Sequence, residues 1–290
     1  MKTPTKIDHP LRSQLAQCSI AICGLAKNCA RTLPENLNFI EAISSLFKSV
    51  KVVVVENGSA DSTRVQLDNW AKKNKTVKIV EGDLAAFSND KITPGVNFYY
   101  SKYRIARLAH LRNQYLEELK KSEIDFDYLL VMDFDVDKIS ISGVLDSFAQ
   151  QNSWDAVAAF GYSVSPRLKK RYHDTFALVF LNNASMPQTE NSIKKIQQDW
   201  VPDSVSNSLQ PVYAAFGGLS IYKWHLVKDL QYQVMTNEDS GVEVRCEHYS
   251  YCAQLQAGLG KRMMVNPFMH LRYERFIDTA YRAIKLLINY

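Results

Sequence analysis

The sequence predicts an α/β fold in which a mixed, mostly parallel sheet is flanked by helices, as a single domain of two joined halves. Short apolar runs of strand length alternate with segments of helical periodicity, which is the pattern of βαβ units. Residues 51–55 read Lys-Val-Val-Val-Val, and continuous valine suits a parallel strand that is covered on both faces. A chain of 290 residues with 46% hydrophobic content can bury the sizeable core that such a fold requires.

Composition and charge narrow the class of protein. The formal net charge of +5 is modest, and we expect no nucleic-acid partner. The 5 cysteines show no Cys-x-x-Cys pair and no zinc-site spacing, and their odd number fits a reducing compartment. The N-terminal residues lack the apolar region of a signal peptide, and no run of about 18 apolar residues marks a transmembrane helix. We therefore expect a cytoplasmic protein.

The first predicted strand is the apolar run 19–25. A loop over 28–34 follows it and leads into a helix. The apolar residues of this helix recur at helical spacing and are Leu37, Ile40, Ile43 and Leu46. The second strand is 51–55, and a third is predicted over 77–80.

A polar loop directly follows strand 51–55 and leads into the next helix. Because it lies at the carboxyl end of a strand, its side chains Glu56, Asn57 and Asp61 are placed to hydrogen-bond a nucleoside. The alternative is an ordinary capped turn, in which Asp61 or Ser62 is the N-cap of the helix. This segment alone does not separate the two interpretations.

Residues 104–120 form a predicted helix whose apolar stripe contains an arginine. At about 100° per residue, Arg112 falls inside the stripe and Arg104 at its edge. A burial-facing guanidinium needs an anionic partner, because its desolvation without one is costly. That partner is either the acidic segment that follows, in a structural ion pair, or the diphosphate of a bound ligand.

Residues 128–137 contain an apolar run of strand length that ends in three carboxylates, Asp133, Asp135 and Asp137. On one side of a strand such like charges repel each other unless a cation or a basic group separates them. Carboxylate oxygens are the ligands of Mg²⁺ and Mn²⁺, and this cluster follows a strand, where α/β sheets bind ligands. An Asp-rich turn is the alternative. An EF-hand is excluded, because Lys138 and Val144 occupy its Gly and Glu positions.

The second half begins with a predicted strand over 154–160, followed by a loop-rich, basic stretch over 162–191. A later apolar segment contains Gly217 and Gly218. Paired glycines inside a strand pattern indicate a bulge or a close approach of the backbone to a ligand.

A polar turn that contains Asp239 precedes a predicted helix over 246–258. Glu247 and His248 lie at the start of this helix. They are either catalytic groups or polar residues of a first helical turn, where an acid is favourable. A short strand over 265–267, closed by a proline, is the last predicted strand.

With these segments in this order, the chain resembles the GT-A glycosyltransferases, broadly the family 2-like nucleotide-sugar transferases with a DXD motif. The resemblance covers about residues 18–270 and rests on VVVVENGSADST, VMDFDVD, FGGLSIYK and CEHYSYCAQLQAGLGKRMMVNP. It implies a GT-A domain over 1–270. The nucleotide-donor half of that domain is about 18–140, and the acceptor half is 141–270.

Together with the residue patterns, the resemblance gives an expected site. Many members of the family carry two acids where this chain has Glu247 and His248, and Asp137 makes the identity of the metal-binding pair ambiguous. The expected residues are Glu247 and His248 for catalysis; Glu56, Asn57, Asp61, Arg104, Arg112 and Asp133 for the donor; Gly217, Gly218 and Asp239 for the acceptor pocket; and Asp135 and Asp137 for the metal.

The resemblance implies a glycosyltransferase that depends on Mn²⁺ or Mg²⁺. We expect it to move one sugar from a UDP- or GDP-sugar to a glycan or lipid-linked acceptor, in cell-surface polysaccharide synthesis. The Gln-x-x-Arg-Trp motif of processive synthases is missing, which argues for transfer of a single sugar. The alternatives are a nucleotidyltransferase acting on sugar phosphates, for which 24–28 is a poor phosphate loop, and a nucleotide- or glycan-binding module without turnover.

Residues 271–290 are predicted to form a C-terminal amphipathic helix. Apolar residues recur at helical spacing, and Arg275, Arg282 and Lys285 lie off that stripe. The helix either packs on the core of the domain or makes peripheral contact with an anionic membrane through 275–290.

Overall fold

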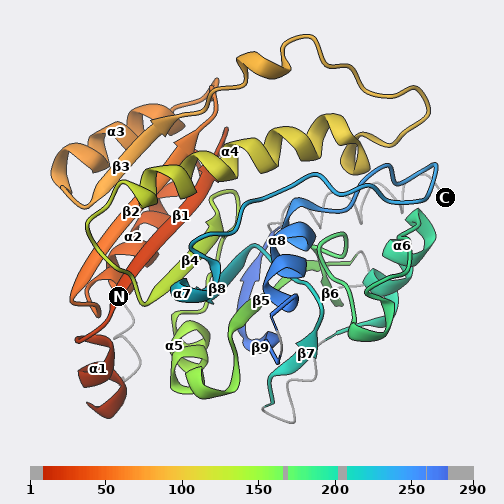
Figure 1. Ribbon diagram of the computed structural model, residues 1–290. Coiled ribbons are helices and arrows are strands. Elements are labelled where there is room, and N and C mark those ends of the chain that lie inside the picture. The colour runs from red at the N-terminus through yellow and green to blue at the C-terminus, as the bar shows by residue number, and fades with distance from the viewer. Residues whose placement is uncertain (1–8, 166–168, 202–207, 259, 274–290) are drawn as a thin grey trace.

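The structure is a computed structural model that describes residues 9–165, 169–201, 208–258 and 260–273 (Figure 1). The strands within these residues are β1 (Ser19–Ala26), β2 (Ser49–Glu56), β3 (Val77–Glu81), β4 (Tyr128–Asp133), β5 (Ala156–Val164), β6 (Lys170–Tyr172), β7 (Gln210–Val212), β8 (Leu219–Lys223) and β9 (Met263–Arg272). The α-helices in the same ranges are α1 (His9–Leu15), α2 (Leu33–Ser44), α3 (Thr63–Lys73), α4 (Lys102–Lys120), α5 (Ile141–Ala149), α6 (Glu190–Asp199), α7 (Trp224–Val227) and α8 (Glu247–Gln256).

These strands form one sheet in the order β3-β2-β1-β4-β8-β5-β9-β7, and β6 pairs with β5. Strands β1 to β4 are parallel to one another, and β5 and β9 run in the same direction. Strand β8 lies antiparallel between β4 and β5, while β6 and β7 are antiparallel to β5 and β9. The predicted mixed, mostly parallel sheet is therefore confirmed, and the sequence patterns gave no indication of the reversed β8.

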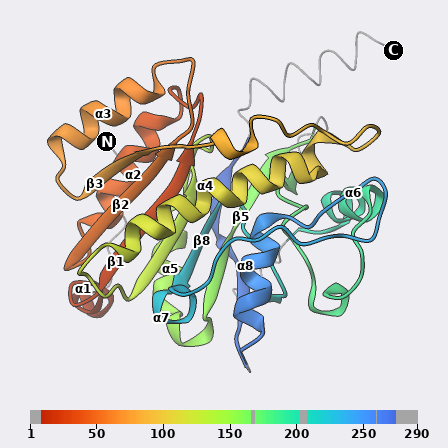
Figure 2. The ribbon, with the colours of Figure 1, turned by 45° about the horizontal axis from the view of Figure 1, so that its top comes forward.

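Alternate residues of the strands pack on opposite faces of the sheet. In β1, Ala21 and Cys23 belong to one core, which α4 and α8 cover, whereas Ile20 and Ile22 belong to a second core under α2, α3 and α5. Figure 2 shows α4 and α8 together on the near side of the sheet. The valines of β2 divide between the two cores in the same way, as expected for a strand covered on both faces.

The topology brings the ends of several strands to one edge of the sheet. Strands β1, β2 and β4 end at this edge, and the antiparallel β8 begins there. The turn before β8 therefore lies beside the end of β4, where the N–H of Asp133 donates to the carbonyl of Gly218 at 2.9 Å. Ligands of α/β sheets bind at such carboxyl edges.

The prediction of a short strand over 265–267 is wrong in its length, because β9 (Met263–Arg272) continues through the proline. Asn266 pairs with Ala159 of β5, but the next pair is His270 with Phe160, so the residues between them bulge out of the ladder. The bulge accommodates Pro267, which has no N–H to donate to a neighbouring strand.

Strand β9 ends at Arg272, beyond the expected start of a C-terminal helix at 271. The remainder of that expected helix, residues 274–290, lies outside the described residues. Within the described ranges, no helix is both long enough and apolar enough to cross a bilayer.

Candidate active site

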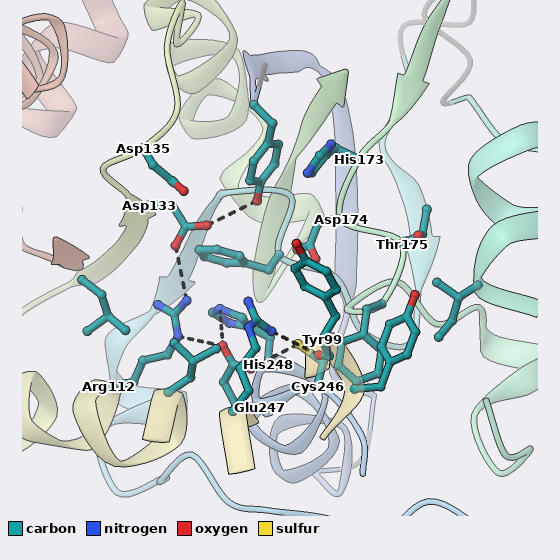
Figure 3. Close-up of a pocket in the computed structure, with 18 of the residues that line it drawn as sticks. Tyr99, Arg112, Asp133, Asp135, His173, Asp174, Thr175, Cys246, Glu247 and His248 are labelled. Carbon is teal, nitrogen blue, oxygen red and sulfur yellow. Dashed lines mark hydrogen bonds and ion pairs between the residues drawn. The ribbon is translucent and has the colours of Figure 1, made fainter. Parts of the chain in front are cut away.

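A cavity of about 630 Å³ opens at the carboxyl edge of the sheet (Figure 3). Its walls come from the ends of β1 and β4, from α4 and α6, from the start of α8 and from the segment 173–176. The structure brings six of the residues singled out in the sequence to this cavity. They are Arg104, Arg112, Asp133, Asp135, Glu247 and His248.

Arg112 of α4 links two acids of the cavity and is only 4% exposed. Its Nε donates to Glu247 Oε1 at 3.1 Å, and its Nη2 donates to Asp133 Oδ1 at 3.3 Å. The guanidinium carbon also lies 5.0 Å from the ring centre of Phe216 and 5.8 Å from that of Tyr232. The anionic partners that a buried arginine requires are thus present, and they come from β4 and α8.

Asp133 and Asp135 lie on the same wall as this arginine. Asp133 is the last residue of β4, and the hydroxyl of Tyr273 donates to its Oδ2 at 3.3 Å. Burial raises the pKa of Asp133 to about 7; Arg112 opposes this rise, while Asp135 and Asp174 add to it. Burial also raises the pKa of Asp135. Arg112 offsets only part of the cost of ionising these two buried carboxyls, and a bound cation would favour their ionised form further.

Glu247 is the first residue of α8 and is nearly inaccessible to solvent. The Sγ of Cys246 donates to its Oε2 at 3.4 Å, and His248 Nε2 lies 3.7 Å from its Oε1. The His248 ring stacks on Phe216, with 3.6 Å between the ring centres. Burial, with the charge of Arg112, holds the pKa of His248 well below its usual range. His248 is therefore neutral at pH 7 and is no ionic partner for Glu247.

The third carboxylate of the acidic segment, Asp137, does not line the described cavity. Arg272 donates to both of its oxygens, at 2.8 Å each, and the backbones of these two residues form a β-bridge. Because β4 ends at Asp133, the alternation of side chains between the two faces of a strand does not extend to Asp137. The structure therefore separates this acid from Asp133 and Asp135.

The loop after β2 is organised by hydrogen bonds to its own carboxylates. The N–H of Ser59 donates to Glu56 Oε1 at 2.6 Å. Asp61 accepts from the N–H groups of Ala30 and Thr63, at 3.1 Å and 2.9 Å. Ser62 occupies the N-cap position of α3 as expected, but its side chain makes no capping hydrogen bond, and Asp61 orders the turn from the residue before it.

None of the three side chains predicted to bind a nucleoside in this loop lines the described cavity. The loop is nevertheless joined to the end of β1, because the N–H of Ala60 donates to Asn28 Oδ1 at 2.7 Å. Asn28 directly follows the cavity residue Lys27. The N–H of Asn57 donates to the carbonyl of Ala26 at 3.1 Å, which ties the same two strand ends together.

The remaining predicted polar residues differ in their positions. Arg104 lines the cavity, and its Nη1 donates to the carbonyl of Tyr99 at 3.3 Å. Asp239 is outside the described cavity; its Oδ1 accepts from the N–H groups of Gly241 and Val242, at 3.0 Å each, and so fixes a turn.

The paired glycines form the turn before β8, with φ of 62° at Gly217 and 82° at Gly218, in the left-handed region. A Cβ atom on Gly217 would lie 2.0 Å from the carbonyl oxygen of Ala159 in β5. The N–H of Gly217 donates to Asp174 Oδ2 at 3.1 Å. The close approach is thus to β5 and to a cavity carboxylate, and the glycines support the described cavity without lining it.

Several residues that line the cavity were not indicated by any sequence pattern. They are Tyr99, Tyr100, Asp174, Lys194 and Tyr273. Asp174 has no acidic neighbour in the loop-rich stretch, and neither periodicity nor spacing marks it. The two tyrosines belong to the long segment between β3 and α4, and Lys194 belongs to α6. Only the tertiary fold brings them to the same cavity.

Similar folds occur among solved structures. A mycobacterial protein matches with a TM-score of 0.52 and 13% identity, over 99% of this chain and 79% of that one. A second match is glucosyl-3-phosphoglycerate synthase from Mycobacterium tuberculosis, solved with Mn²⁺, uridine diphosphate and phosphoglyceric acid. Its TM-score is 0.50 at 13% identity, and the match covers 100% of this chain and 84% of the synthase. Mannosyltransferase PcManGT from Pyrobaculum calidifontis, solved with GDP-Man and Mn²⁺, matches with a TM-score of 0.47 and 14% identity. That match covers 93% of this chain and only 60% of the mannosyltransferase.

No curated protein sequence matches the chain significantly. The family model described as Cryptococcal mannosyltransferase 1 matches residues 20–251, which include all of β1 but its first residue, the acidic end of β4 and the start of α8. The chain therefore belongs to the Cryptococcal mannosyltransferase 1 family and is a glycosyltransferase of the GT-A fold.

Proposed function

We propose that this chain transfers one sugar from a nucleoside-diphosphate donor to a hydroxyl of a glycan or lipid-linked acceptor, in cell-surface polysaccharide synthesis, with a divalent cation. The observation that carries the proposal is the composition of the cavity described above. Asp133 and Asp135 lie on its wall at the end of β4, and Glu247 lies at the start of α8. These are the groups needed to bind a metal-diphosphate and to activate a hydroxyl.

The two aspartates fit a divalent cation such as Mn²⁺ or Mg²⁺. Within the described residues, no group of three His, Cys, Asp or Glu side chains is placed to hold a metal ion by itself. Mg²⁺ is commonly bound through one or two carboxylates together with substrate phosphates, so Asp133 and Asp135 would hold the ion only with the donor. The bound cation would neutralise charge that develops on the leaving diphosphate. Glucosyl-3-phosphoglycerate synthase, whose fold is similar, was solved with both Mn²⁺ and uridine diphosphate, which supports a site that holds a cation together with a nucleoside diphosphate.

The proposal assigns Glu247 as the base that accepts the proton of the acceptor hydroxyl. Its position at the start of α8 faces the cavity, and Arg112 holds one oxygen of its carboxylate. Neither ring nitrogen of His248 has a hydrogen-bond partner in the described structure, although the residue is 2% exposed. A substrate hydroxyl is a neutral group that would satisfy such a nitrogen.

The nucleoside of the donor would lie toward the loop after β2. Glu56, Asn57 and Asp61 are outside the cavity, but the contacts of Asn28 connect their loop to the cavity residue Lys27. The proposal therefore extends the donor site from Asp135 along the ends of β1 and β2.

We place the reaction in a reducing compartment such as the cytoplasm. All five cysteines are free, and four of them are buried. Burial raises the pKa of the Cys23 and Cys252 thiols, which keeps them unreactive.

The decisive experiment compares the wild-type chain with Asp135→Ala in a transfer assay with Mn²⁺. We expect the variant to lose transfer and to lose its response to added metal, while its circular dichroism spectrum stays unchanged. Asp146→Asn is the matched control, because Asp146 accepts amide hydrogen bonds on α5 and is not part of the described cavity wall. Full activity of Asp135→Ala, or of the wild type in excess chelator, would contradict the metal-dependent mechanism.

Glu247→Gln tests the proposed base separately. We expect transfer to slow by a factor of about 100 or more, because the amide cannot accept the proton. The affinity for the nucleotide-sugar should hardly change, since the residue would face the acceptor. An effect confined to donor affinity would mean that the role of Glu247 is misassigned.

A further inference from the structure

Asp174 is a carboxylate of the cavity that neither the sequence patterns nor the proposed chemistry uses. It belongs to the segment after β6 and lies across the cavity from Asp133 and Asp135, as Figure 3 shows. Tyr99 and Thr175 are among the cavity residues drawn near it. Its function is therefore a separate question from those of the metal ligands and of the base.

The fold holds Asp174 in place from three sides. The N–H of Gly217 donates to its Oδ2 at 3.1 Å. The N–H of His173 donates to the carbonyl of Gly161 at 2.9 Å, and a Cβ on Gly161 would lie 2.2 Å from the Gly217 carbonyl oxygen. The N–H of Thr175 donates to the His173 carbonyl at 2.9 Å, which closes the turn around the aspartate. The packed backbones therefore fix the position of Asp174, which a side chain that is merely solvated at the surface would not require.

The second oxygen of Asp174 has no hydrogen bond or ion pair with any other described residue, so it is free to accept from a ligand. Burial raises the pKa of this carboxyl to about 6, and the charge of Glu247 adds to the rise. At neutral pH the group is thus a carboxylate that is poorly solvated, and hydrogen-bond donors in the cavity would stabilise it.

The surroundings of Asp174 exclude two classes of ligand. An anionic group is unfavourable as a direct partner of Asp174, because the carboxylate is itself negative and Glu247 adds negative charge nearby, which Arg104 and Arg112 offset only in part. Among the described residues, Asp174 does not form a metal-binding group of three with Asp133 and Asp135. Neutral donors of hydrogen bonds remain, and sugar hydroxyls are such donors.

Asp174 faces the other functional groups across the same cavity. Arg112 contacts both Asp133 and Glu247, so these two carboxylates lie near each other, and Figure 3 shows Asp174 across the cavity from Asp133 and Asp135. In the proposed reaction, the transferred sugar lies in this cavity, between the diphosphate at Asp133 and Asp135 and the acceptor hydroxyl near Glu247. Asp174 is therefore placed to contact that sugar from the opposite side.

We infer that Asp174 binds a hydroxyl of the transferred sugar and so contributes to recognition of the donor. This inference rests on the proposed function, because it takes the donor to be a nucleotide-sugar whose diphosphate lies at Asp133 and Asp135. It assigns Asp174 neither to the diphosphate nor to the proton transfer. A loss of this carboxylate should therefore weaken binding of the nucleotide-sugar and leave binding of the nucleoside diphosphate alone unchanged.

The experiment measures two affinities in each variant by calorimetry, with Mn²⁺ present. The probes are GDP with GDP-mannose and UDP with UDP-glucose, and the pair that the wild-type chain binds is used. For Asp174→Ala we expect the affinity for the nucleotide-sugar to fall about 10- to 100-fold, the usual effect of losing a hydrogen bond to a charged group. The affinity for the nucleoside diphosphate should stay within about twofold of the wild type.

Asp174→Asn guards against a loss of folding, because its side-chain oxygen still accepts from the N–H of Gly217. It should lose about 10-fold in affinity for the nucleotide-sugar, since charge-assisted hydrogen bonds are the stronger ones. Asp146→Asn is again the control and should bind both probes as the wild type does.

The possible outcomes separate this inference from the proposed function. Equal losses for both probes, or no loss for either, would overturn the role of Asp174, whatever happens to turnover. Lost transfer with unchanged affinity for the nucleotide-sugar would also overturn it, and would point to a role in proton transfer. If the wild-type chain binds none of the probes, the proposed function itself fails and the inference fails with it.

Discussion

Arg112 stabilises two carboxylates of the cavity at once, and its removal leaves both without a cation. It is 4% exposed and contacts Glu247 and Asp133 through different nitrogens. Breaking a buried ion pair by removing one partner typically costs about 3–5 kcal/mol. We therefore expect Arg112→Met to lower the free energy of unfolding by about this amount, as measured by urea denaturation in chelator.

Lys120 provides the control for this measurement. It pairs with Glu117 at 3.0 Å, and the two side chains are 34% and 53% exposed. Exposed ion pairs contribute about 0–1 kcal/mol, so Lys120→Met should change stability little. Equal effects of the two substitutions would show that the buried pairs of Arg112 do not stabilise the fold.

Asp133 should make the stability of the metal-free protein depend on pH. Burial raises the pKa of its carboxyl from 3.8 to about 7. Between these values the folded chain holds a proton that the unfolded chain has lost, so stability falls as the pH rises through this window. One such proton gives a slope of at most about 1.4 kcal/mol per pH unit.

Urea denaturation in chelator at several pH values measures this slope. Asp133→Asn removes the titrating group, and its stability should vary less between pH 4 and pH 7 than that of the wild type. A slope that is identical in the two proteins would assign the pH dependence to other groups, among them Asp174, whose pKa burial also raises, to about 6.

Short sequence patterns identified those site residues whose role is visible from their immediate neighbours in the sequence. Asp133 and Asp135 follow an apolar strand, and Arg112 interrupts an apolar helical stripe, so both features are visible without a structure. Asp137 shares the acidic pattern, but its arginine partner is 135 residues away along the chain. Asp174 has no such pattern, because its position depends on the packing of β5 and the turn before β8. Tertiary contacts of this kind cannot be predicted from local spacing.

At the scale of elements, continuous apolar runs and helical periodicity predicted the parallel half of the sheet well. The helix expected over 104–120 is α4, Lys102–Lys120, and the strand expected over 77–80 is β3, Val77–Glu81. The direction of β8 was not predictable, because a buried strand has the same apolar pattern whether it runs parallel or antiparallel to its neighbours. The strand expected over 154–160 is β5, Ala156–Val164, which extends farther than its apolar pattern.

The turn before β8 allows a test of how closely these elements must pack. Gly217 and Gly58 have nearly the same φ, 62° and 59°, but a Cβ on Gly217 would lie 2.0 Å from the Ala159 carbonyl oxygen, whereas Gly58 has open space around it. Gly58→Ala should therefore cost only the conformational strain, about 1–2 kcal/mol. Gly217→Ala should cost clearly more and should also lower transfer, because it displaces the N–H that holds Asp174.

Thermal or urea denaturation of the two alanine variants measures this difference directly. Similar losses of stability in both variants would mean that the contact between the turn and β5 adjusts easily. In that case, the paired glycines would be required for their backbone conformation alone.

The two halves of the molecule are joined by more than the sheet. The segment between β3 and α4 reaches the second half, where Asn97 Nδ2 donates to Glu190 Oε1 at 3.1 Å. In the same region, Thr93 Oγ1 and the N–H of Lys102 donate to the carboxylate of Glu243, at 2.9 Å and 2.7 Å. Because this segment also supplies Tyr99 and Tyr100 to the cavity, a ligand bound there contacts both halves.

A ligand that contacts both halves should stabilise the whole molecule, and the cavity predicts that Mn²⁺ and a nucleoside diphosphate act together. Metal alone finds only two carboxylates, Asp133 and Asp135, and a diphosphate alone meets their negative charge. With both present, each supplies what the other lacks, so the shift in Tm should exceed the sum of the separate shifts. Saturation at 100 times Kd corresponds to about 2.7 kcal/mol.

Differential scanning fluorimetry with GDP or UDP, with and without Mn²⁺, measures this synergy. Asp135→Ala should abolish it, because the variant loses a carboxylate of the pair, while Asp146→Asn should retain it. A shift with metal alone that equals the shift with both ligands would mean that the cation binds without the diphosphate. The two carboxylates at the end of β4 would then not form a site that the donor completes.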